Sequence, residues 1–278
     1  MKLLDIGTSN VNLAVIKMQV WYMSGAGNDF MVVDARGKKI NFEKMAVELC
    51  AMKNADGFMA IDNSDIADFK LHFYNADGTR GEMCGNGARC ICRFAYEHGV
   101  VGENMTVETD AGIVEGTRLN QVQYRVKLNN PGFVDLYRKD DVAYVELGNP
   151  GVPHAIKEMQ NLEWDQAEEL RELARELRYD SAFSKGANVN FYTMLAEDEI
   201  RILTYERGVE DYTLACGTGS ASTAVVLKKL GKLKGNKVAV HNEGGVLEVQ
   251  IESDGDDITE IYLEGPTEIL ETLKINMT

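Results

Sequence analysis

Proline is scarce in this sequence, and long apolar runs are missing. Only 4 of the 278 residues are proline, and no Ser/Gly-rich or single-sign segment occurs, so no flexible linker between independent domains is predicted. No window reaches the roughly eighteen apolar residues that a membrane-spanning helix requires. The first 17 residues are interrupted by Asp5, Asn10 and Asn12 and lack the apolar centre of a signal peptide. These absences predict a soluble, cytoplasmic protein whose domains are closely coupled.

Basic residues are also in deficit. The chain has 29 Lys and Arg against 44 Asp and Glu, which gives a formal net charge of -15. Such a field repels a phosphate backbone, so we expect no nucleic acid partner. Hydrophobic residues make up 45% of the chain, enough for one large or two modest cores, which excludes disorder as the main state.

The five cysteines show no recognisable pairing pattern. Their number is odd, and none of them belongs to a CxxC pair. This fits neither a disulfide framework nor a zinc site. We therefore expect reduced thiols and no bound metal.

The N-terminal segment carries an isolated motif. Residues 3–6 and 11–16 flank a Gly-Thr-Ser-Asn turn and predict a β-hairpin, which resembles the phosphate-binding hairpin of actin-like sugar and pantothenate kinases. No further motif of such a kinase follows. We interpret residues 1–17 as an extension that activity does not require, with a nucleotide-binding protein as the alternative.

The rest of the sequence contains an internal duplication. Four segments form two matching pairs: 73–87 with 204–219, and 106–115 with 239–248. Each copy contains a CGxG motif, which begins at Cys84 in the first copy and at Cys216 in the second. One duplicated α/β unit, built as strand, loop, CGxG, helix and hairpin, accounts for both copies.

Apolar periodicity predicts four helices. Two of them follow the CGxG motifs, and the other two cover sheets as ordinary amphipathic elements. The predicted bounds are 88–98 and 220–230 for the first two helices, and 41–53 and 165–178 for the others.

The paired CGxG turns point to chemistry. A cysteine at a helix start lies beside unpaired backbone N–H groups and the positive end of the helix dipole, which favour its thiolate. The neighbouring glycines let a carboxylate or phosphate approach the same amides. Two such thiols on opposite sides of one small acidic ligand suit proton removal from one face of a carbon and delivery to the other.

Cys84 and Cys216 are therefore predicted to be the catalytic bases of a racemase or epimerase. A disulfide-exchange pair is the alternative for these two thiols. Cys50, Cys90 and Cys92 lie on helical faces without such a turn, and we expect them in the core.

Polar residues near these turns are candidates for holding the ligand. Because a neutral Cα–H is a poor acid, the developing charge must be drawn into a tightly held carboxylate. Arg207 in YERG is a natural bidentate clamp for a carboxylate, and Glu206 is a candidate for binding an ammonium group or orienting a thiol. His154 in VPHA is a candidate base beside a thiol. Four asparagines in turn-like settings complete the set: Asn28, Asn75, Asn188 and Asn190.

Together these segments resemble the diaminopimelate epimerase family. The resemblance runs from about Met18 to about Pro266, and its motifs are GAGNDFMVVDARG, YNADGTRGEMCGNGARC, VPHAI, ANVNF, YERGVEDYTLACGTGSASTAV and LEGP, in this order. It implies a cofactor-independent isomerase that interconverts LL- and meso-diaminopimelate in lysine and cell-wall precursor synthesis. The implied fold is α/β (α+β), with two similar pseudo-symmetric domains, each a mixed sheet or barrel wrapped round a central helix.

The resemblance also implies roles for single residues. The two catalytic cysteines fall on Cys84 and Cys216, with assistance from His154 and Glu206. The substrate contacts fall on Asn28, Asn75, Gly85, Asn86, Asn188, Glu206, Arg207, Gly217 and Thr218. The implied domains are 18–132, which the tail 265–278 rejoins, and 133–264. No cofactor is implied, and a homodimer stays open.

The chain departs from the family pattern at two positions. Where many members have Gly-Asn-Pro-His, this chain has Val152 in place of the asparagine. A glutamine of some members is replaced by Gly57. Neither change affects the α-carbon chemistry, so diaminopimelate stays the predicted substrate and another amino acid is the alternative.

Overall fold

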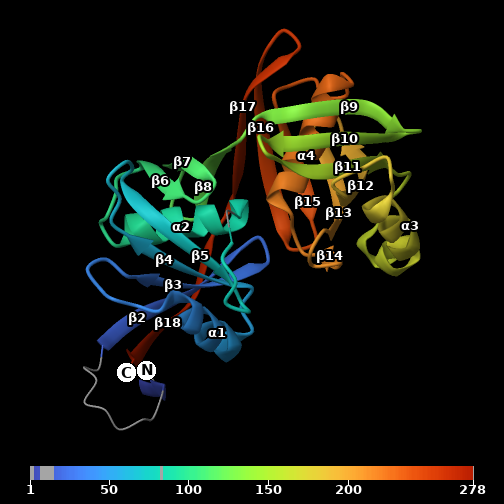
Figure 1. Ribbon diagram of the computed structural model, residues 1–278. Helices are drawn as coiled ribbons and strands as arrows, with labels where there is room; N and C mark the ends of the chain where they lie inside the picture. The colour runs from blue at the N-terminus through green and yellow to red at the C-terminus, as the bar shows by residue number, and fades with distance from the viewer. Residues whose placement is uncertain (1–2, 7–15, 82–83, 278) are drawn as a thin grey trace. The chain divides into compact units, whose positions relative to one another are not determined.

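The chain forms two compact units, which are described separately (Figure 1). The computed structural model describes the backbone at residues 3–6, 16–81 and 84–277. Unit 1 comprises residues 1–124 and 267–278, and unit 2 comprises residues 125–266. The chain passes between the units after Tyr124 and again after Pro266.

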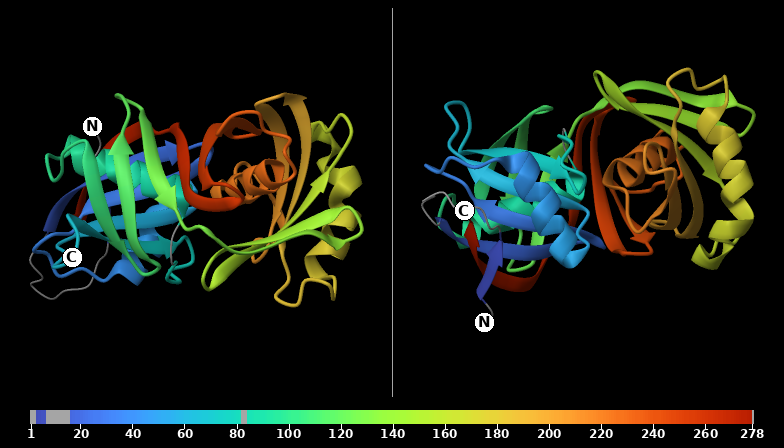
Figure 2. Two further views of the ribbon diagram at one scale, coloured as in Figure 1. Left: turned by 90° about the horizontal axis from the view of Figure 1, so that it is seen from above. Right: turned by 60° about the horizontal axis from the view of Figure 1, so that its bottom comes forward.

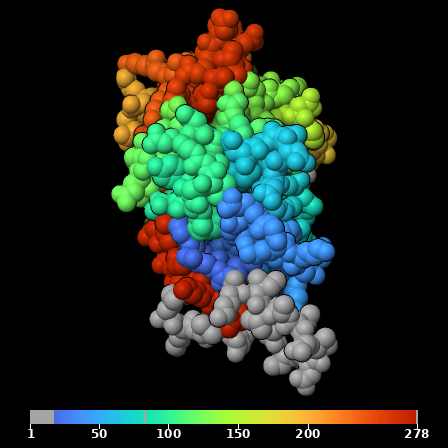
Figure 3. Space-filling model, turned by 90° about the vertical axis from the view of Figure 1, so that its left-hand side faces the viewer, coloured from blue at the N-terminus to red at the C-terminus, as the bar shows by residue number. Residues whose placement is uncertain are grey.

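Unit 1 is a mixed sheet with two helices. Its elements are β1 (Leu3–Ile6), β2 (Ile16–Gly25), β3 (Asn28–Asp34), α1 (Phe42–Lys53), β4 (Gly57–Asp62), β5 (Phe69–Asn75), α2 (Gly85–Glu97), β6 (Asn104–Thr109), β7 (Gly112–Arg118), the start of β8 (Gln123–Leu128) and β18 (Glu268–Met277). The C-terminal strand β18 pairs antiparallel with β2, and the two strands lie side by side at the surface in Figure 3. The sheet then continues through β3, β4, β5, β6 and β7.

Unit 2 has the same plan. Its elements are β9 (Pro131–Lys139), β10 (Val142–Gly148), β11 (Gly151–Glu158), the 3-10 turn η1 (Trp164–Gln166), α3 (Ala167–Tyr179), β12 (Asn188–Ala196), β13 (Glu199–Glu206), β14 (Asp211–Thr213), α4 (Gly217–Lys229), β15 (Lys237–Asn242), β16 (Gly245–Asp254) and β17 (Asp257–Pro266). The sheet runs from β9 through β10, β11, β12, β13, β15 and β16 to β17.

Strand directions match between the units. From β18 to β7 in unit 1 the pairings are antiparallel, antiparallel, parallel, antiparallel, parallel and antiparallel. The pairings from β9 to β16 in unit 2 follow the same order. This repeated topology confirms the pseudo-symmetric mixed α/β fold that the duplication predicts.

One helix in each unit is central and the other covers the outside. Figure 2 shows α4 end-on within the strands of unit 2, with α3 outside them. Residues 85–95 of α2 are all buried, and so are ten of the thirteen residues of α4. The outer helices are less buried: α1 buries Met45, Ala46, Leu49 and Cys50, and α3 buries Ala174 and Leu177. A helix surrounded by strands has no face left for solvent.

The four predicted helices are present, but the central two start earlier than predicted. Periodicity placed their starts at residues 88 and 220, whereas α2 begins at Gly85 and α4 at Gly217. The difference arises because the CGxG glycines, which carry no apolar signal, form the first helical turn. Both helices end before the predicted glycines, since Gly99 (φ 64°) and Gly231 (φ 68°) adopt the left-handed conformation.

The predicted N-terminal hairpin stays a prediction, because its turn and most of its second strand lie outside the described residues. Strand β1 pairs parallel with β18, with Leu3 opposite Lys274 and Ile6 opposite Met277. Residues 11–15 of the expected second strand lie outside the described residues, and Ile16 opens β2 instead. Within the described part of the chain, no helix is long and apolar enough to cross a membrane.

Candidate active site

Both CGxG cysteines are helix N-caps, as predicted. Cys84 caps α2 with φ −126° and ψ 124°, and Cys216 caps α4 with φ −118° and ψ 110°. The backbone of both cysteines is therefore extended, and the glycine that follows each cysteine is the first helical residue. The two thiols differ in exposure, because Cys84 is half-buried whereas Cys216 is only 7% exposed.

In unit 1, the turn between β2 and β3 lies against the first turn of α2. The turn residues Ala26 (φ 54°) and Gly27 (φ 87°) both have positive φ, which is typical of a two-residue type I′ hairpin turn. Gly25 permits the close approach, since a Cβ atom there would lie 2.9 Å from the Asn86 carbonyl oxygen. This packing brings two predicted site residues together, because Asn86 Nδ2 donates to Asn28 Oδ1 at 2.7 Å.

Further side chains extend this contact in both directions. Arg89 donates from Nη2 to Asn86 Oδ1 at 2.9 Å and from Nη1 to the Gly85 carbonyl oxygen at 3.3 Å. Asn28 Nδ2 donates to Asp56 Oδ2 at 3.2 Å, and the Asp29 amide donates to the same oxygen at 2.9 Å. A chain of hydrogen bonds therefore runs from Arg89 through Asn86 and Asn28 to Asp56.

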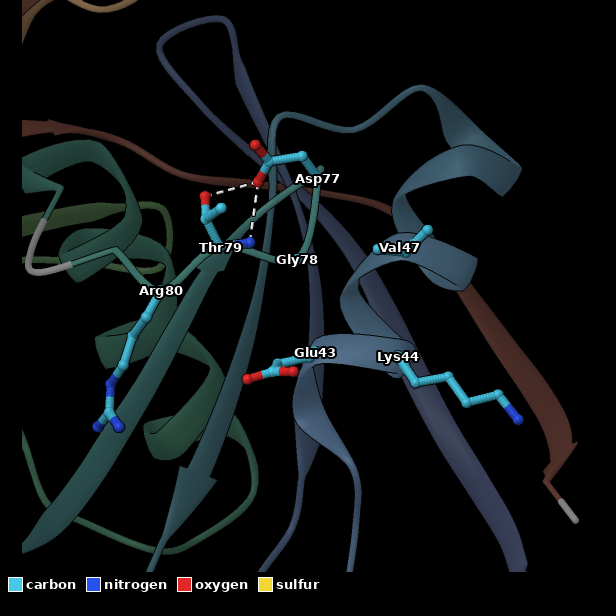
Figure 4. Close-up of a pocket in the computed structure, with 7 residues that line it drawn as sticks. All are labelled: Glu43, Lys44, Val47, Asp77, Gly78, Thr79 and Arg80. Atoms are coloured by element: carbon cyan, nitrogen blue, oxygen red, sulfur yellow. Dashed lines mark hydrogen bonds between the residues drawn. The ribbon is translucent and has the colours of Figure 1, made fainter.

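Asn75 belongs to a separate turn at the end of β5. Its Nδ2 donates to Thr79 Oγ1 at 2.9 Å, and its backbone amide donates to the Thr79 carbonyl oxygen at 2.8 Å. The Thr79 backbone amide and hydroxyl both donate to Asp77 Oδ1 (Figure 4). Asn75 is exposed, so this turn holds a polar side chain at the surface.

A cavity of about 560 Å³ lies between this turn and α1 (Figure 4). It is lined by Glu43, Lys44, Val47, Asp77, Gly78, Thr79 and Arg80. Arg80 bonds Asp110. None of the predicted site residues lines this cavity, so it is not the predicted site.

In unit 2, the predicted site residues form a buried polar cluster. Asn190 Nδ2 donates to His154 Nδ1 at 3.1 Å and to the Ala155 carbonyl oxygen at 3.2 Å. Asn188 Nδ2 lies 3.5 Å from His154 Nε2, and Asn188 Oδ1 accepts from the Arg207 backbone amide at 2.8 Å. The parallel pairing of β11 with β12 places His154 directly opposite Asn188 and so creates the cluster.

His154 is a neutral imidazole in this setting. It is fully buried, and burial lowers its pKa to about 3, with the Arg207 charge acting in the same direction and the bond from Asn190 opposing it. A neutral imidazole accepts at one nitrogen only, and Nδ1 has the shorter contact to an amide (3.1 Å against 3.5 Å), so the ring proton is assigned to Nε2 and the Asn188 contact is not a hydrogen bond in this tautomer. The Nδ1 lone pair is thus engaged, and the ring is a hydrogen-bond partner in this state.

Glu206 and Arg207 follow each other at the end of β13. Glu206 Oε1 accepts from Thr213 Oγ1 at 2.6 Å, across the pairing of β13 with β14. Arg207 is exposed, and its Nη1 donates to the Lys185 carbonyl oxygen at 3.0 Å. The guanidinium of Arg207 is therefore held at the surface, where it can bind an anion.

The first turn of α4 favours the thiolate of Cys216, as expected, but burial and Glu206 outweigh it. The Cys216 Sγ accepts from the Gly219 amide at 3.4 Å and lies 3.5 Å from Thr218 Oγ1, and both contacts favour the anion. Burial is the larger effect, and together with the charge and hydrogen bond of Glu206 it raises the pKa of Cys216 well above its usual value. Cys216 is therefore a neutral thiol here.

The other three cysteines are core residues, as predicted. Cys50 is 1% exposed, and Cys90 and Cys92 are fully buried. Burial raises the pKa of each of these thiols to about 12. They are unreactive packing residues.

The two departures from the family pattern have different surroundings. A Cβ atom on Gly57 would lie 2.8 Å from the Phe73 ring and 3.0 Å from the Tyr74 carbonyl oxygen, so the ring leaves no room for a side chain. Val152 is 37% exposed on β11, next to Pro153 and His154. The packing of unit 1 therefore requires the glycine at position 57.

Two residues of the network in unit 1 escaped the sequence analysis. Arg89 was passed over because a charged side chain in an amphipathic helix normally faces solvent, yet it is fully buried. No sequence signal marks its burial, because Asn86, Arg89, Arg93 and Glu97 recur along one stripe of α2 and so resemble a solvent face. Asp56 carries no signal either, because its role depends on Asn28, which is distant in sequence.

Two repeated α/β units, each with a helix capped by cysteine, define a class of duplicated α/β folds. Solved structures with this fold include a phenazine biosynthesis protein of the PhzF family from Bacillus anthracis (TM-score 0.72, 15% identity, covering 93% of this chain and 99% of that one). Another is a probable proline racemase from Agrobacterium radiobacter (TM-score 0.66, 16% identity, covering 92% of each chain). At these identities the likeness concerns the fold alone.

The sequence comparisons are more specific. The family model described as diaminopimelate epimerase matches residues 20–133 and 146–270. The diaminopimelate epimerase of Aquifex aeolicus is 37% identical over 268 residues, covering 89% of this chain and 94% of its own. That of Caldanaerobacter subterraneus is 36% identical over 275 residues, covering 90% of this chain and 97% of its own. The chain belongs to the diaminopimelate epimerase family.

Proposed function

We propose that the protein interconverts LL- and meso-diaminopimelate without a cofactor, in the synthesis of lysine and cell-wall precursors. The observation that carries the proposal is the matched pair of N-cap cysteines, Cys84 and Cys216, in two repeats of one fold. The relatives named diaminopimelate epimerase, at 36% and 37% identity over about nine-tenths of the chain, support the choice of substrate.

Two thiols in unequal protonation states carry the reaction. The pKa of Cys216 is raised by burial and by Glu206, which supports a thiol that donates a proton. Cys84 then acts as the thiolate that removes the Cα proton from the opposite face, and the roles exchange in the reverse direction. Glu206 assists Cys216 directly, and His154 acts through the hydrogen bond that Asn190 donates to its Nδ1.

The remaining site residues bind the substrate. We assign the backbone amides at the starts of α2 and α4 (Gly85, Asn86, Gly217 and Thr218) to the substrate carboxylates, because the N-terminus of a helix suits an anion. The side chains assigned to substrate are Asn28, Asn75, Asn188, Glu206 and Arg207. We assign residues 18–132 with 265–278 and residues 133–264 to two epimerase domains, each of which supplies one of the two catalytic cysteines.

The decisive experiment measures proton exchange at Cα. LL-diaminopimelate incubated with the protein in deuterium oxide is expected to yield meso-diaminopimelate carrying deuterium at one α-carbon. A panel of other amino acids, with proline and hydroxyproline included, serves as the control and is expected to exchange at the uncatalysed rate. Exchange in another amino acid but not in diaminopimelate would replace this function with that of a related racemase.

Location and assembly complete the proposal. The acidic chain with reduced cysteines suits the cytoplasm, where glutathione and thioredoxin keep thiols reduced. A homodimer is the proposed assembly. Sedimentation velocity of the purified protein is expected to give twice the 30.9 kDa chain mass, and a single-chain mass would refute the dimer.

A further inference from the structure

Arg89 is the most unusual charged residue of unit 1. Its side chain is fully buried in the second turn of α2, a place where the positive end of the helix dipole already disfavours a cation. No carboxylate pairs with it in the described part of the chain, and its Nε has no hydrogen-bond partner there. Burying an unpaired guanidinium costs several kcal/mol, so packing alone does not explain this residue.

The hydrogen bonds of Arg89 determine the orientation of two amides. A guanidinium can only donate, so it fixes the Asn86 side chain with Oδ1 toward Arg89 and Nδ2 toward Asn28. A carboxylate can only accept, so Asp56 fixes Asn28 with Nδ2 toward itself and Oδ1 toward Asn86. Turning over either amide would set donor against donor or acceptor against acceptor. The two charged ends therefore lock both asparagines in one sense.

We propose that Arg89 is a positioning residue for the isomerase reaction: through the Asn86 side chain it holds the Asn28 side chain in the single orientation that binds substrate. The inference rests on the proposed function, in which the Asn28 side chain binds the substrate. An asparagine that turns over exchanges its donor for an acceptor and so repels the group that it previously bound. A buried cation with no other ionic partner is suited to prevent this exchange.

The second repeat provides an internal contrast. The residue five positions after the cysteine is Arg89 in the first repeat and Ala221 in the second, and both are buried. The position after CG is Asn86 in the first repeat and Thr218 in the second. Threonine has no amide to orient, and the second repeat accordingly has alanine, not arginine, five positions after the cysteine.

A double-mutant cycle tests the chain of hydrogen bonds. It uses Arg89 and Asn28, two residues of the chain that do not touch each other. Arg89→Lys keeps the charge but loses the planar fork, and it is expected to lower kcat/KM by about tenfold to a hundredfold. Asn28→Ala is expected to lower it by a similar factor. If Arg89 acts through Asn28, the double variant is no worse than Asn28→Ala alone. Multiplying effects would overturn the inference.

Arg93→Lys is the matched control. Arg93 lies one turn further along α2, is 8% exposed and donates to the Thr267 carbonyl oxygen at 2.5 Å, outside the chain of asparagines. Its substitution is expected to leave kcat/KM within about twofold and to combine multiplicatively with Asn28→Ala. A loss of activity equal to that of Arg89→Lys would show that any buried arginine of α2 matters.

A spectroscopic measurement separates this inference from the proposed function, because it needs no substrate. Protein labelled with ¹⁵N at asparagine gives side-chain NH₂ signals, which Asn28→Ala and Asn86→Ala assign. Arg89→Lys is expected to shift the signals of both asparagines, and Arg93→Lys to shift neither.

If Arg89→Lys does not fold, Asp56→Ala tests the same chain of hydrogen bonds from its other end. Asp56 is exposed, so its loss leaves the core intact, and both asparagine signals are expected to shift. If Asp56→Ala leaves the Asn86 signals unchanged, or Arg89→Lys leaves the Asn28 signals unchanged, the chain of hydrogen bonds does not transmit orientation. Normal spectra in a protein without epimerase activity would instead refute the proposed function alone.

Discussion

The two CGxG turns share a backbone but differ in their charged surroundings. Cys84 and Cys216 cap α2 and α4 with almost the same φ and ψ angles. Near Cys84 lies the buried cation of Arg89, and the two groups attract each other. Near Cys216 lies the Glu206 carboxylate, which raises the pKa of the thiol. The two turns therefore match in backbone geometry and differ in the charge beside the thiol.

This difference suits a reaction that needs an acid and a base together. Two equivalent thiols in equivalent surroundings would share one protonation state, and a pair of thiols or of thiolates cannot transfer a proton across a carbon. A cation beside one thiol and a carboxylate beside the other favour the mixed state. The predictions below test whether the two halves are matched in geometry and opposite in charge.

The largest expected effect is the loss of either thiol. Cys84→Ser and Cys216→Ser should each lower kcat by about 10²-fold to 10⁴-fold, since a serine hydroxyl is a far weaker acid than a thiol and does not ionise at neutral pH to act as the base. Cys50→Ser is the control, because Cys50 is a core residue of α1. The measurement is the rate of diaminopimelate epimerisation, with circular dichroism to establish folding. Near-normal turnover in either catalytic variant would exclude the two-base scheme.

The next effect concerns the carboxylate. Glu206→Gln removes the charge that, after burial, does most to raise the pKa of Cys216, so the pKa of this thiol should fall. More thiolate is then present at a given pH, and the midpoint of the pH profile for alkylation of Cys216 by iodoacetamide should move to lower pH. Mass spectrometry of the Cys216 peptide provides the measurement. Epimerisation should slow, because the acid of the pair is partly lost.

Asp211→Asn is the control for Glu206→Gln. Asp211 is an exposed carboxylate of β14 that bonds Arg171, and it does not act on Cys216. In Asp211→Asn, the pH profile for alkylation of Cys216 should match that of the unmodified protein. An equal shift in both variants would mean that net charge, and not the Glu206 contact, sets the pKa of the thiol.

A smaller effect compares the second glycines of the two motifs. A Cβ atom on Gly219 would lie 2.3 Å from Asn190 Oδ1, whose amide also bonds His154 and Thr204. A Cβ atom on Gly87 would meet Met59 Sδ at 3.1 Å, and a methionine side chain adapts easily. Gly219→Ala should lower the free energy of unfolding by about 1–3 kcal/mol.

Gly87→Ala should stay within about 1 kcal/mol of the unmodified protein, because the gain in helix propensity offsets the shift of Met59. Urea unfolding followed by circular dichroism measures both variants. Equal losses would show that the two turns are packed alike, against the geometry around Asn190.

The features that sequence predicts best are those written in local patterns. The duplication, the four helices and the placement of Cys84 and Cys216 at helix starts follow from spacing and turn chemistry. The burial of Arg89 does not, because periodicity assigns a solvent face to every helix, and only the closed ring of strands removes that face from α2. The raised pKa of Cys216 depends on Glu206, which β13 brings from ten residues away. Long-range packing therefore decides what each thiol does.

The smallest expected effect is that of the N-terminal segment. Deleting residues 1–15 removes β1, which only extends the sheet of unit 1 alongside β18 and has no counterpart in unit 2. All the site residues lie beyond this segment, so kcat and KM should stay within about twofold. The deleted protein, assayed for epimerisation with and without ATP, provides the measurement. Lost activity, or a response to ATP that only the full chain shows, would support the nucleotide-binding alternative. The strand β1 would then be a functional difference between the two units.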